Sequence, residues 1–439
     1  MLDYRFILEH LPQVKQNIAH RYMKADADKV SSLFTQRNQL TQTLQALQQQ
    51  RNAHAAAMKQ RRDVPEQERL VEAGKKLKAD IAALEERLAQ VEQELAAEGR
   101  RIPNMAHPDA PIGKEDKDNL EVKRVGAPRT FDFEPRDHVQ LGQDLDIIDF
   151  DSGTKVSGTK FYYLKNEGVF LELGLIRYAL DILTRKGFTP YITPDIAKEE
   201  ILEGIGFNPR GAESNVYTLE GEGSCLVGTA EITLGGYYAN MIVPKESLPL
   251  RMAGLSHCFR REAGAAGQFS KGLYRVHQFT KLEMFVCCLP EESEHLHEEL
   301  RLVEEEIFSG LEIPFRVVDT CTGDLGAPAY RKWDLEAWMP GRANPPSPSG
   351  GEWGEVTSTS NCTDYQARRL NIRYKDETGK NRFVHMLNGT ALAVSRALIA
   401  VLENFQEADG SVHLPQALVP YCGFAVISPR SNRSKARAK

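Results

Sequence analysis

Charged side chains flank a glycine-rich segment near the middle of the chain, in a pattern that suits the recognition of phosphate. Arg260, Arg261 and Glu262 directly precede the segment from Ala263 to Gly272. A planar guanidinium at the end of a strand can bind a phosphate through two parallel hydrogen bonds. An Arg-Arg-Glu triplet is usually a solvated surface cluster, however, so the triplet alone is weak evidence for such a site.

The residues that follow the glycine-rich segment strengthen this interpretation. From Val276 to Glu283 the sequence reads as a strand, and its alternation places Phe279, Lys281 and Glu283 on one face. A charged pair beside an aromatic ring is costly on an inward face unless it binds something. The alternative is a half-exposed sheet edge that carries an ion pair.

Motifs for other ligands are missing from the sequence. It contains neither a Walker phosphate-binding loop nor a Gly-x-Gly-x-x-Gly turn, so side chains must hold any bound ATP. The seven cysteines are scattered, include the adjacent Cys287 and Cys288, and lack paired metal-ligand spacing. We therefore expect reduced thiols and no zinc site.

Segments of strand and helix character surround these residues and must position them. Leu255 to Phe259 and Tyr274 to Cys287 predict two strands joined by the glycine-rich segment. Gly168 to Lys186 has apolar residues at helical spacing, and Phe188 to Thr193 reads as a short strand stopped by proline. Gly389 to Phe405 predicts a strongly apolar helix. The fold class expected is α+β, built on antiparallel strands with flanking helices.

A long helical segment precedes this body. Val30 to Arg101 is rich in Gln, Ala, Glu, Leu, Lys and Arg and contains one proline, in the sequence Asp63-Val64-Pro65. Pro65 should separate two helices of roughly 33 residues each, which would form an antiparallel hairpin about 50 Å long. Seven-residue repeats predict its coiled-coil seam, weakly in the first helix and strongly in the second: Leu33, Leu40 and Leu47 with Leu44, then Leu70, Leu77, Leu84 and Val91 with Ile81, Leu88, Leu95 and Ile102. A plain dimerisation coiled coil or a spacer is the alternative.

Length and composition limit the remaining possibilities. The chain has 439 residues and a mass of 49.2 kDa, which suits two unequal domains. A linker rich in proline and glycine suggests residues 1–109 as an N-terminal helical domain with its arm at about 30–101, residues 110–427 as a second, larger domain, and residues 428–439 as a basic tail. The sequence has no apolar run of about 18 residues and no signal or transit pattern, so we expect a cytoplasmic protein without a membrane span. A net charge of −6 argues against indiscriminate coating of nucleic acid, and no DNA partner is expected.

The residues from Arg260 to Gly267 and from Gly272 to Glu283 resemble motif 2 of the seryl-tRNA synthetases. The segment that ends at Pro194 resembles motif 1 of the class II synthetases, and Asn388 to Arg396 with Glu403 to Gln406 resembles motif 3. Further segments also match the family: Thr229-Ala230-Glu231, Asp334 to Pro340 and Glu355 to Arg369. The hairpin falls where this family carries its tRNA-binding arm, so the resemblance covers nearly the whole chain.

The resemblance implies a serine–tRNA ligase that activates L-serine with ATP and transfers it to tRNA(Ser), with tRNA(Sec) left open as a further substrate. It implies a homodimer formed through the motif 1 region, and Mg²⁺ held by Glu355 and Ser358. Arg260 would hold the α-phosphate and the serine carboxylate, and Arg396 the γ-phosphate. The resemblance implies three sets of residues: catalytic Arg260 and Arg396; ATP-binding Arg260, Arg261, Glu262, Val276, Phe279, Glu355, Val356, Thr357, Ser358 and Arg396; and serine-binding Thr229, Ala230, Glu231, Arg260, Glu283 and Thr390.

Several positions depart from the family pattern. Thr390 and Thr357 keep a hydroxyl where serine is usual, and Ser395 replaces a glycine before the motif 3 arginine. The Pro-, Ser- and Gly-rich stretch from Gly341 to Trp353 is longer than is typical of the family.

Two other functions are alternatives for this sequence. A synthetase-like ligase that loads an amino acid onto a carrier protein would share the adenylation chemistry, and a silent paralogue would share the fold. The predicted hairpin favours tRNA over a carrier protein, and retention of Arg260, Glu262, Glu283 and Arg396 argues against a silent paralogue.

Overall fold

The chain forms two compact units, Met1–Met105 and Ala106–Lys439. The computed structural model describes residues 1–59, 64–208, 214–263, 270–343 and 349–430. The domain limits at residues 109 and 427 stay predictions. Most of the basic tail (431–439), part of the glycine-rich segment (264–269) and part of the stretch from Gly341 to Trp353 (344–348) lie outside the described residues.

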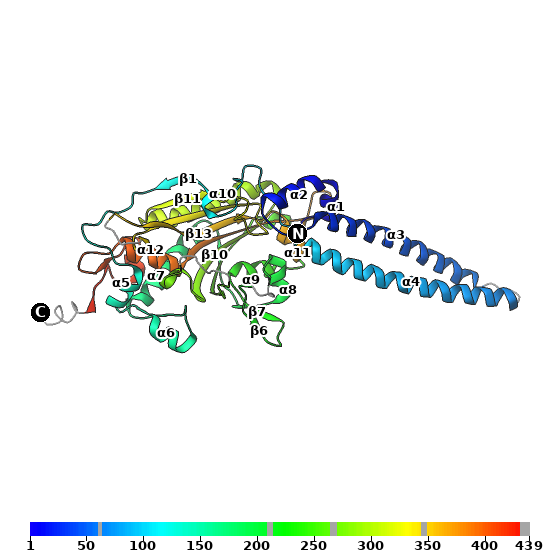
Figure 1. Ribbon diagram of the computed structural model, residues 1–439, viewed down its shortest axis with the longest axis horizontal. Helices are drawn as coiled ribbons and strands as arrows, with labels where there is room; N and C mark the ends of the chain where they lie inside the picture. Colours follow the sequence, from blue (N-terminus) through cyan, green and yellow to red (C-terminus); the bar gives the residue numbers. More distant parts are fainter. Residues whose placement is uncertain (60–63, 209–213, 264–269, 344–348, 431–439) are drawn as a thin grey trace. The chain divides into compact units, whose positions relative to one another are not determined.

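The N-terminal unit is a helical hairpin with two short helices at its base (Figure 1). Its long helices α3 (Ala27–Ala57) and α4 (Val64–Gly99) pack antiparallel, which the sequence predicted. Lys29 pairs with Glu98 at 3.0 Å, and Arg37 pairs with Glu92 at 3.3 Å, so the start of one helix lies against the end of the other. The short helices are α1 (Tyr4–Glu9) and α2 (Leu11–His20).

Burial along α4 follows the seven-residue repeats. Ile81, Val91 and Leu95 are buried, and Leu70, Leu77, Leu84 and Leu88 are partly buried between exposed neighbours. A seam that stays on one side of a helix needs a partner along its whole length, and α3 supplies that partner. The proposed break between the helices is partly outside the described residues, since α4 begins at Val64 directly after residues 60–63.

An eight-stranded sheet forms the centre of the second unit. All neighbouring strands are antiparallel except β4 and β9, which run parallel. This arrangement agrees with the α+β class expected from the sequence. The strands, in sheet order, are β1 (Leu120–Val125), β11 (Phe315–Asp319), β12 (Arg331–Met339), β13 (Glu352–Asn361), β16 (His385–Ala393), β10 (Gln278–Cys288), β9 (Leu250–Phe259) and β4 (Thr189–Ile192).

Helices cover the two faces of this sheet differently. Alternate residues of β10 face two separate cores: Met284 and Val286 pack in one, and Phe285 and Cys287 pack in the other. The first core lies under α7 (Glu167–Arg185), α10 (Ser293–Gly310) and α12 (Val394–Asn404), and the second under α8 (Glu199–Ile205), α9 (Ala230–Tyr237) and α11 (Tyr365–Leu370). Lys281 and Glu283 alternate with the residues of the first core and point to the same face as Phe285. They therefore lie on the second face, where the candidate site is.

The remaining elements are short. The other helices are α5 (His138–Asp144), α6 (Phe150–Ser157) and α13 (Val419–Cys422). The smaller sheets contain β2 (Ile148–Asp149), β3 (Tyr163–Leu164), β5 (Ile196–Lys198), β6 (Thr218–Leu219), β7 (Ser224–Leu226), β8 (Ile242–Val243), β14 (Arg373–Lys375), β15 (Asn381–Phe383), β17 (Val412–His413) and β18 (Val426–Ile427).

Two predicted elements were wrong in their limits. The second motif 2 strand begins at Gln278, because Gly272–Tyr274 form a 3₁₀ turn in which Gly272 has φ +55°. The helix predicted from Gly389 begins only at Val394, since Gly389 to Ala393 complete β16 and pair with β10. A short apolar run fits a buried strand as well as a buried helix, and sheet pairing decided this one.

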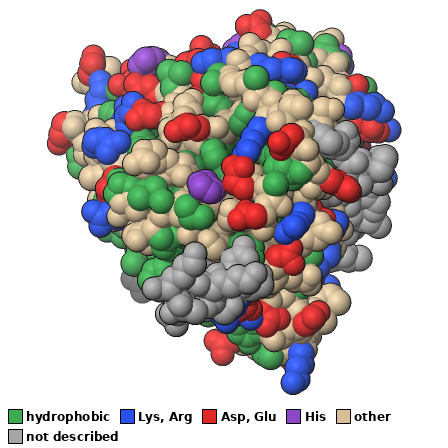
Figure 2. Space-filling model, turned by 90° about the vertical axis from the view of Figure 1, so that its left-hand side faces the viewer, with side chains coloured by type: hydrophobic (Ala, Val, Ile, Leu, Met, Phe, Trp, Pro, Cys, Tyr) green, Lys and Arg blue, Asp and Glu red, His purple; other side chains and the backbone are tan. Residues whose placement is uncertain are grey.

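Surface and thiol chemistry agree with the composition. Acidic, basic and apolar side chains are intermingled on the face shown in Figure 2. All seven cysteines are buried and free of disulfides, as expected. Within the described residues, no helix combines the length and the apolarity needed to cross a membrane.

Candidate active site

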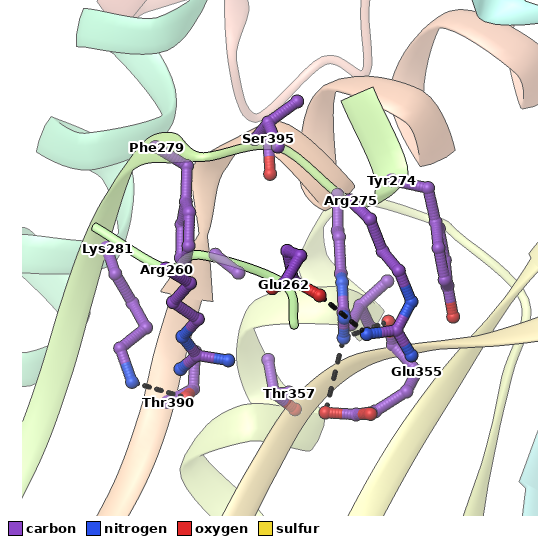
Figure 3. A pocket seen from close by; sticks show the side chains of 14 residues that line it. Arg260, Glu262, Tyr274, Arg275, Phe279, Lys281, Glu355, Thr357, Thr390 and Ser395 are labelled. Carbon is purple, nitrogen blue, oxygen red and sulfur yellow. Dashed lines mark hydrogen bonds and ion pairs between the residues drawn. The ribbon is translucent and has the colours of Figure 1, made fainter. Parts of the chain in front are cut away.

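Two pockets adjoin on the second face of the large sheet and share Arg260, Lys281, Glu355 and Thr390. We call the first the arginine pocket; it is lined by Arg260, Glu262, Tyr274, Arg275, Val276, Phe279, Lys281, Glu355, Val356, Thr357, Thr390, Ala393, Ser395 and Arg396 (Figure 3). We call the second the carboxylate pocket. It has a volume of about 690 Å³, and Thr229, Glu231, Glu283, Ser358 and Asn388 are among its other lining residues.

Arg260 stands at the junction of the two pockets. Its Nε donates a hydrogen bond to the carbonyl of Gly228 at 3.3 Å, and its guanidinium lies 5.3 Å from the ring centroid of Phe279. In Figure 3 the two side chains are adjacent, with the guanidinium directed into the pocket. A guanidinium fixed on an aromatic face keeps its remaining N–H groups for a ligand.

The base of the glycine-rich segment is held by paired strand ends. Arg260 N–H donates to the carbonyl of His277 at 3.0 Å, and His277 Nδ1–H donates back to the carbonyl of Arg260 at 2.8 Å. Glu262 follows with φ +50°, an uncommon backbone for a residue with a side chain, and pairs with Arg275 at 3.0 Å. Strained backbone of this kind is concentrated at functional sites.

Arg396 supplies the second guanidinium of the arginine pocket. Its Nη1 donates to the carbonyl of Glu355 at 2.9 Å and lies 3.2 Å from the Glu355 carboxylate. Burial favours the neutral form of this carboxyl, but Arg396, Lys332 and Arg260 outweigh burial and hold the pKa of Glu355 below its ordinary value. The carboxylate therefore carries its charge at neutral pH.

An irregularity in β13 brings Glu355 and Ser358 to the same cavity. In a regular strand, residues three apart point to opposite faces. The register between β12 and β13 shifts at Leu335/Glu336, so that Glu355 pairs with Glu336 while Thr357 pairs with Leu335. This bulge re-aims the strand, and Glu355 and Ser358 both line the carboxylate pocket. Their oxygens fit a hard divalent cation.

The carboxylate pocket is built from the start of α9 and the middle of the sheet. Thr229 caps α9, and its hydroxyl accepts from the backbone N–H of Glu231 at 3.3 Å. Glu231 Oε1 accepts from Gln366 Nε2 at 2.6 Å and from Asn388 Nδ2 at 3.0 Å. Burial, followed by the nearby Glu283, raises the pKa of Glu231 to about 7.

Glu283 is paired within the same pocket. Its carboxylate forms an ion pair with Lys281, and Thr390 Oγ1 lies 3.5 Å from Glu283 Oε2. Figure 3 also shows Lys281 bonded to Thr390, at 3.4 Å. The prediction that Lys281 and Glu283 share one face with Phe279 agrees with these positions.

Most residues expected at the site line one pocket or the other. The exceptions are Arg261, which is exposed and bonds through its backbone to Asn215, and Ala230, which is buried in the second core. Ser395 lines the arginine pocket next to Arg396, and the hydroxyl of Thr357 is buried. Sequence reasoning missed Tyr274 and Arg275, which it had placed in a strand, together with Gln366, Asn388 and Lys332.

Among the described residues, no group of three or more His, Cys, Asp or Glu side chains is arranged to hold a metal ion by itself. Glu355 and Ser358 offer two oxygen donors to the pocket. Mg²⁺ is usually bound by one or two protein oxygens together with substrate phosphates and water, so this pair fits that ion.

Family models match both units of the chain. Residues 1–106 match the seryl-tRNA synthetase N-terminal domain, and residues 217–405 match the class II tRNA synthetase core domain (G, H, P, S and T). The serine–tRNA ligase of Treponema denticola is 70% identical over 424 residues, covering 97% of this chain and 99% of that protein. The serine–tRNA ligase of Rubrobacter xylanophilus is 55% identical over 429 residues, and the match covers 98% of this chain and 99% of that protein.

Solved structures agree. A crystal structure of seryl-tRNA synthetase from Pyrococcus horikoshii complexed with ATP has a TM-score of 0.89 at 40% identity, covering 98% of this chain and 100% of that one. A crystal structure of cytoplasmic serine–tRNA ligase from Naegleria fowleri in complex with AMP has a TM-score of 0.82 at 30% identity. This match covers 98% of this chain and 99% of that one.

Proposed function

Because this chain belongs to the seryl-tRNA synthetases and is a serine–tRNA ligase, we propose that its two adjoining pockets hold ATP and L-serine and that its hairpin binds tRNA(Ser). The observation that carries the proposal is the position of Arg260, which lines both pockets at their junction. The family evidence does not favour a carrier-protein ligase or a silent paralogue. We also place the enzyme in the cytoplasm.

The arginine pocket takes ATP in this proposal. Phe279 stacks on adenine, Glu262 accepts from the adenine amino group, and Arg260 contacts the α-phosphate. Phe279 and Tyr274 lie on opposite sides of the pocket in Figure 3, and Arg396 lies 4.7 Å from the Tyr274 ring centroid. An ATP that runs from Phe279 toward Tyr274 would therefore bring its γ-phosphate to Arg396.

The carboxylate pocket takes serine. Glu231 and Glu283 offer acceptors for the ammonium and the side-chain hydroxyl, with Thr229 and Thr390 beside them. A pocket built to bond a hydroxyl rejects alanine and glycine, since its own buried polar groups would be left unpaired.

The reaction needs no protein nucleophile. A serine carboxylate oxygen attacks the α-phosphorus, the bond to the bridging oxygen breaks, and pyrophosphate leaves. The terminal ribose hydroxyl of tRNA then attacks the adenylate carbonyl and releases AMP. Arg260 and Arg396 orient the reactants and stabilise charge on the phosphates. Glu355 and Ser358 would hold Mg²⁺, which neutralises phosphate charge when bound.

We propose a homodimer through the region of α7 and β4. Phe170 and Leu173 on α7 are 56% and 57% exposed, and Ile192 on β4 is 87% exposed. Apolar side chains this exposed on neighbouring elements are typical of a protein interface. Sedimentation should give twice the chain mass of 49.2 kDa; a species of single mass at micromolar concentration would contradict the dimer.

The function is tested by ATP-dependent attachment of labelled serine to unfractionated tRNA. Serylation that requires ATP, serine and tRNA together supports the proposal. Serine-dependent pyrophosphate exchange without any charging of tRNA would contradict it and would point to another acceptor.

The affinity for serine should depend on pH through Glu231. Its pKa of about 7 means that the carboxyl is mostly neutral at pH 6 and mostly ionised at pH 7.5. An ionised Glu231 attracts the serine ammonium, so the KM for serine should fall roughly eightfold over this interval, following the ionised fraction. Glu283, Lys281 and Arg260 are the charged groups that interact with Glu231.

Pyrophosphate exchange measured at each pH gives the KM for serine and for ATP. Glu231→Gln should flatten the serine profile, and the KM for ATP should change little in either protein. An equal change in both constants would show that the effect does not come from Glu231.

A further inference from the structure

A buried histidine–glutamate pair lies behind the arginine pocket and has no role in the function proposed above. His138 is the first residue of α5, and Glu403 lies near the end of α12; each side chain is 1% exposed. Glu403 Oε1 accepts from the backbone N–H of His138 at 3.0 Å and is 2.7 Å from His138 Nδ1.

The partners of His138 determine which ring nitrogen carries a proton. The backbone N–H of Leu273 points to His138 Nε2 at 3.1 Å, and a backbone amide can only donate. Nε2 is therefore the acceptor, and Nδ1 carries the hydrogen that it donates to Glu403. The ring is neutral and links the carboxylate of α12 to the 3₁₀ turn Gly272–Tyr274.

The second oxygen of Glu403 holds another turn. Glu403 Oε2 accepts from the backbone N–H of Gly341 at 2.8 Å, and Gly341 lies in the 3₁₀ turn Pro340–Arg342. One carboxylate therefore fixes two turns that are far apart in the sequence, directly at Gly341 and through His138 at Leu273.

Both turns present side chains to the same part of the arginine pocket. Tyr274 follows Leu273, and Arg342 follows Gly341. Two guanidiniums contact the Tyr274 ring, because Arg342 and Arg396 each lie 4.7 Å from its centroid. The position of Arg396 relative to the pocket thus depends on where the two turns hold Tyr274 and Arg342.

Close packing leaves these turns little freedom. A Cβ on Gly272 would lie 2.1 Å from His138 Nε2, and one on Gly341 would lie 2.5 Å from Glu403 Oε1. Both distances are shorter than real Cβ contacts, so the two turns pack directly against the side chains of His138 and Glu403.

We propose that His138 and Glu403 are positioning residues for the phosphate end of the ATP site: they fix the turns that carry Tyr274 and Arg342, and through them the Arg396 guanidinium. The inference rests on the proposed function, since it takes the arginine pocket as the ATP site. The pair touches none of the groups assigned to adenine or serine.

Two isosteric substitutions of His138 separate its two bonds. His138→Gln can place a carbonyl where Nε2 accepts from Leu273, whereas His138→Asn can donate to Glu403 but cannot reach Leu273. Binding of ATP and of AMP is measured by calorimetry. We expect His138→Asn and Glu403→Gln to lower the affinity for ATP about tenfold, because the loss of one positioning contact typically has an effect of about this size. We expect His138→Gln to lower the affinity for ATP less than about threefold.

Affinity for AMP, which lacks the β- and γ-phosphates, should stay within about twofold in all three variants. An equal loss of affinity for ATP and for AMP would show that the pair has only a general structural role, and it would overturn the proposal. An unchanged affinity for ATP in His138→Asn would also overturn it. Glu407→Gln is the matched control, because Glu407 lies four residues after Glu403 and forms an exposed ion pair with Arg129.

Thermal melting shows whether each variant folds. Should His138→Asn fail to fold, Glu403→Gln keeps the size of its side chain, changes the same bond from the other helix and carries the same expectation by itself. Loss of serine-dependent exchange in the unmodified chain would overturn the proposed function instead, so the two failures are distinguishable.

Discussion

Replacement of Arg260 by alanine should lower serine-dependent pyrophosphate exchange by about 10³-fold or more. Loss of one preorganised donor to transition-state charge typically costs 10²–10³-fold. Arg260 is expected to cost more, because its guanidinium lies at the junction of both pockets and would contact both reacting partners. Exchange of labelled pyrophosphate into ATP measures the effect directly.

Two further variants make this result interpretable. Arg260→Lys keeps the charge but loses the fork of N–H donors, so it should retain part of the activity. Arg382→Ala removes an exposed arginine of β15 that pairs with Asp376 at 3.0 Å, and it should leave exchange unchanged. Exchange by Arg260→Ala at more than about a tenth of the unmodified rate would contradict the role of Arg260.

Shortening the hairpin should separate the two half-reactions. Removal of residues 41–88, with a short glycine-rich turn joining Leu40 to Ala89, keeps the Lys29–Glu98 and Arg37–Glu92 pairs at the base. Serine-dependent exchange should remain within about twofold, because no residue of either pocket is removed. Charging of tRNA should fall at least ~10²-fold, because a binding arm that contacts many phosphates carries much of the affinity.

The control for this truncation is a variant of the intact arm in which exposed residues of α4 outside the seam are exchanged, for example Glu85→Gln. Full charging by the truncated enzyme would mean that the hairpin is only a spacer. Loss of exchange together with charging would mean that the truncation damaged the catalytic unit.

The parts of the fold that could be predicted are those with a local period. The seam of α4 follows from leucines every seven residues, and the inward face of β10 follows from alternation at Phe279, Lys281 and Glu283. The helix predicted from Gly389 to Ala393 was wrong, because small and apolar residues suit a buried strand and a buried helix equally. Pairing with β10, more than a hundred residues earlier, settled the choice.

In the candidate site, too, local sequence patterns predicted some features and the pairing of distant segments decided the others. A regular strand would send Glu355 and Ser358 to opposite faces, and the bulge that unites them depends on the pairing with β12. Nor could the donors to Glu231 be read from the sequence, because Gln366 and Asn388 lie 135 and 157 residues away. The resemblance to a family supplied residues, but the network that orients them is a property of the tertiary structure.

With ATP and serine in the two pockets, as proposed above, the four residues common to both pockets would link the binding of the two substrates. Arg260, Lys281, Glu355 and Thr390 cannot respond to a ligand in one pocket without altering the walls of the other. Whatever factor serine applies to the dissociation constant of ATP, ATP must apply to that of serine, because the coupling free energy is reciprocal. We therefore expect a change in the affinity for one substrate to be matched by an equal change in the affinity for the other.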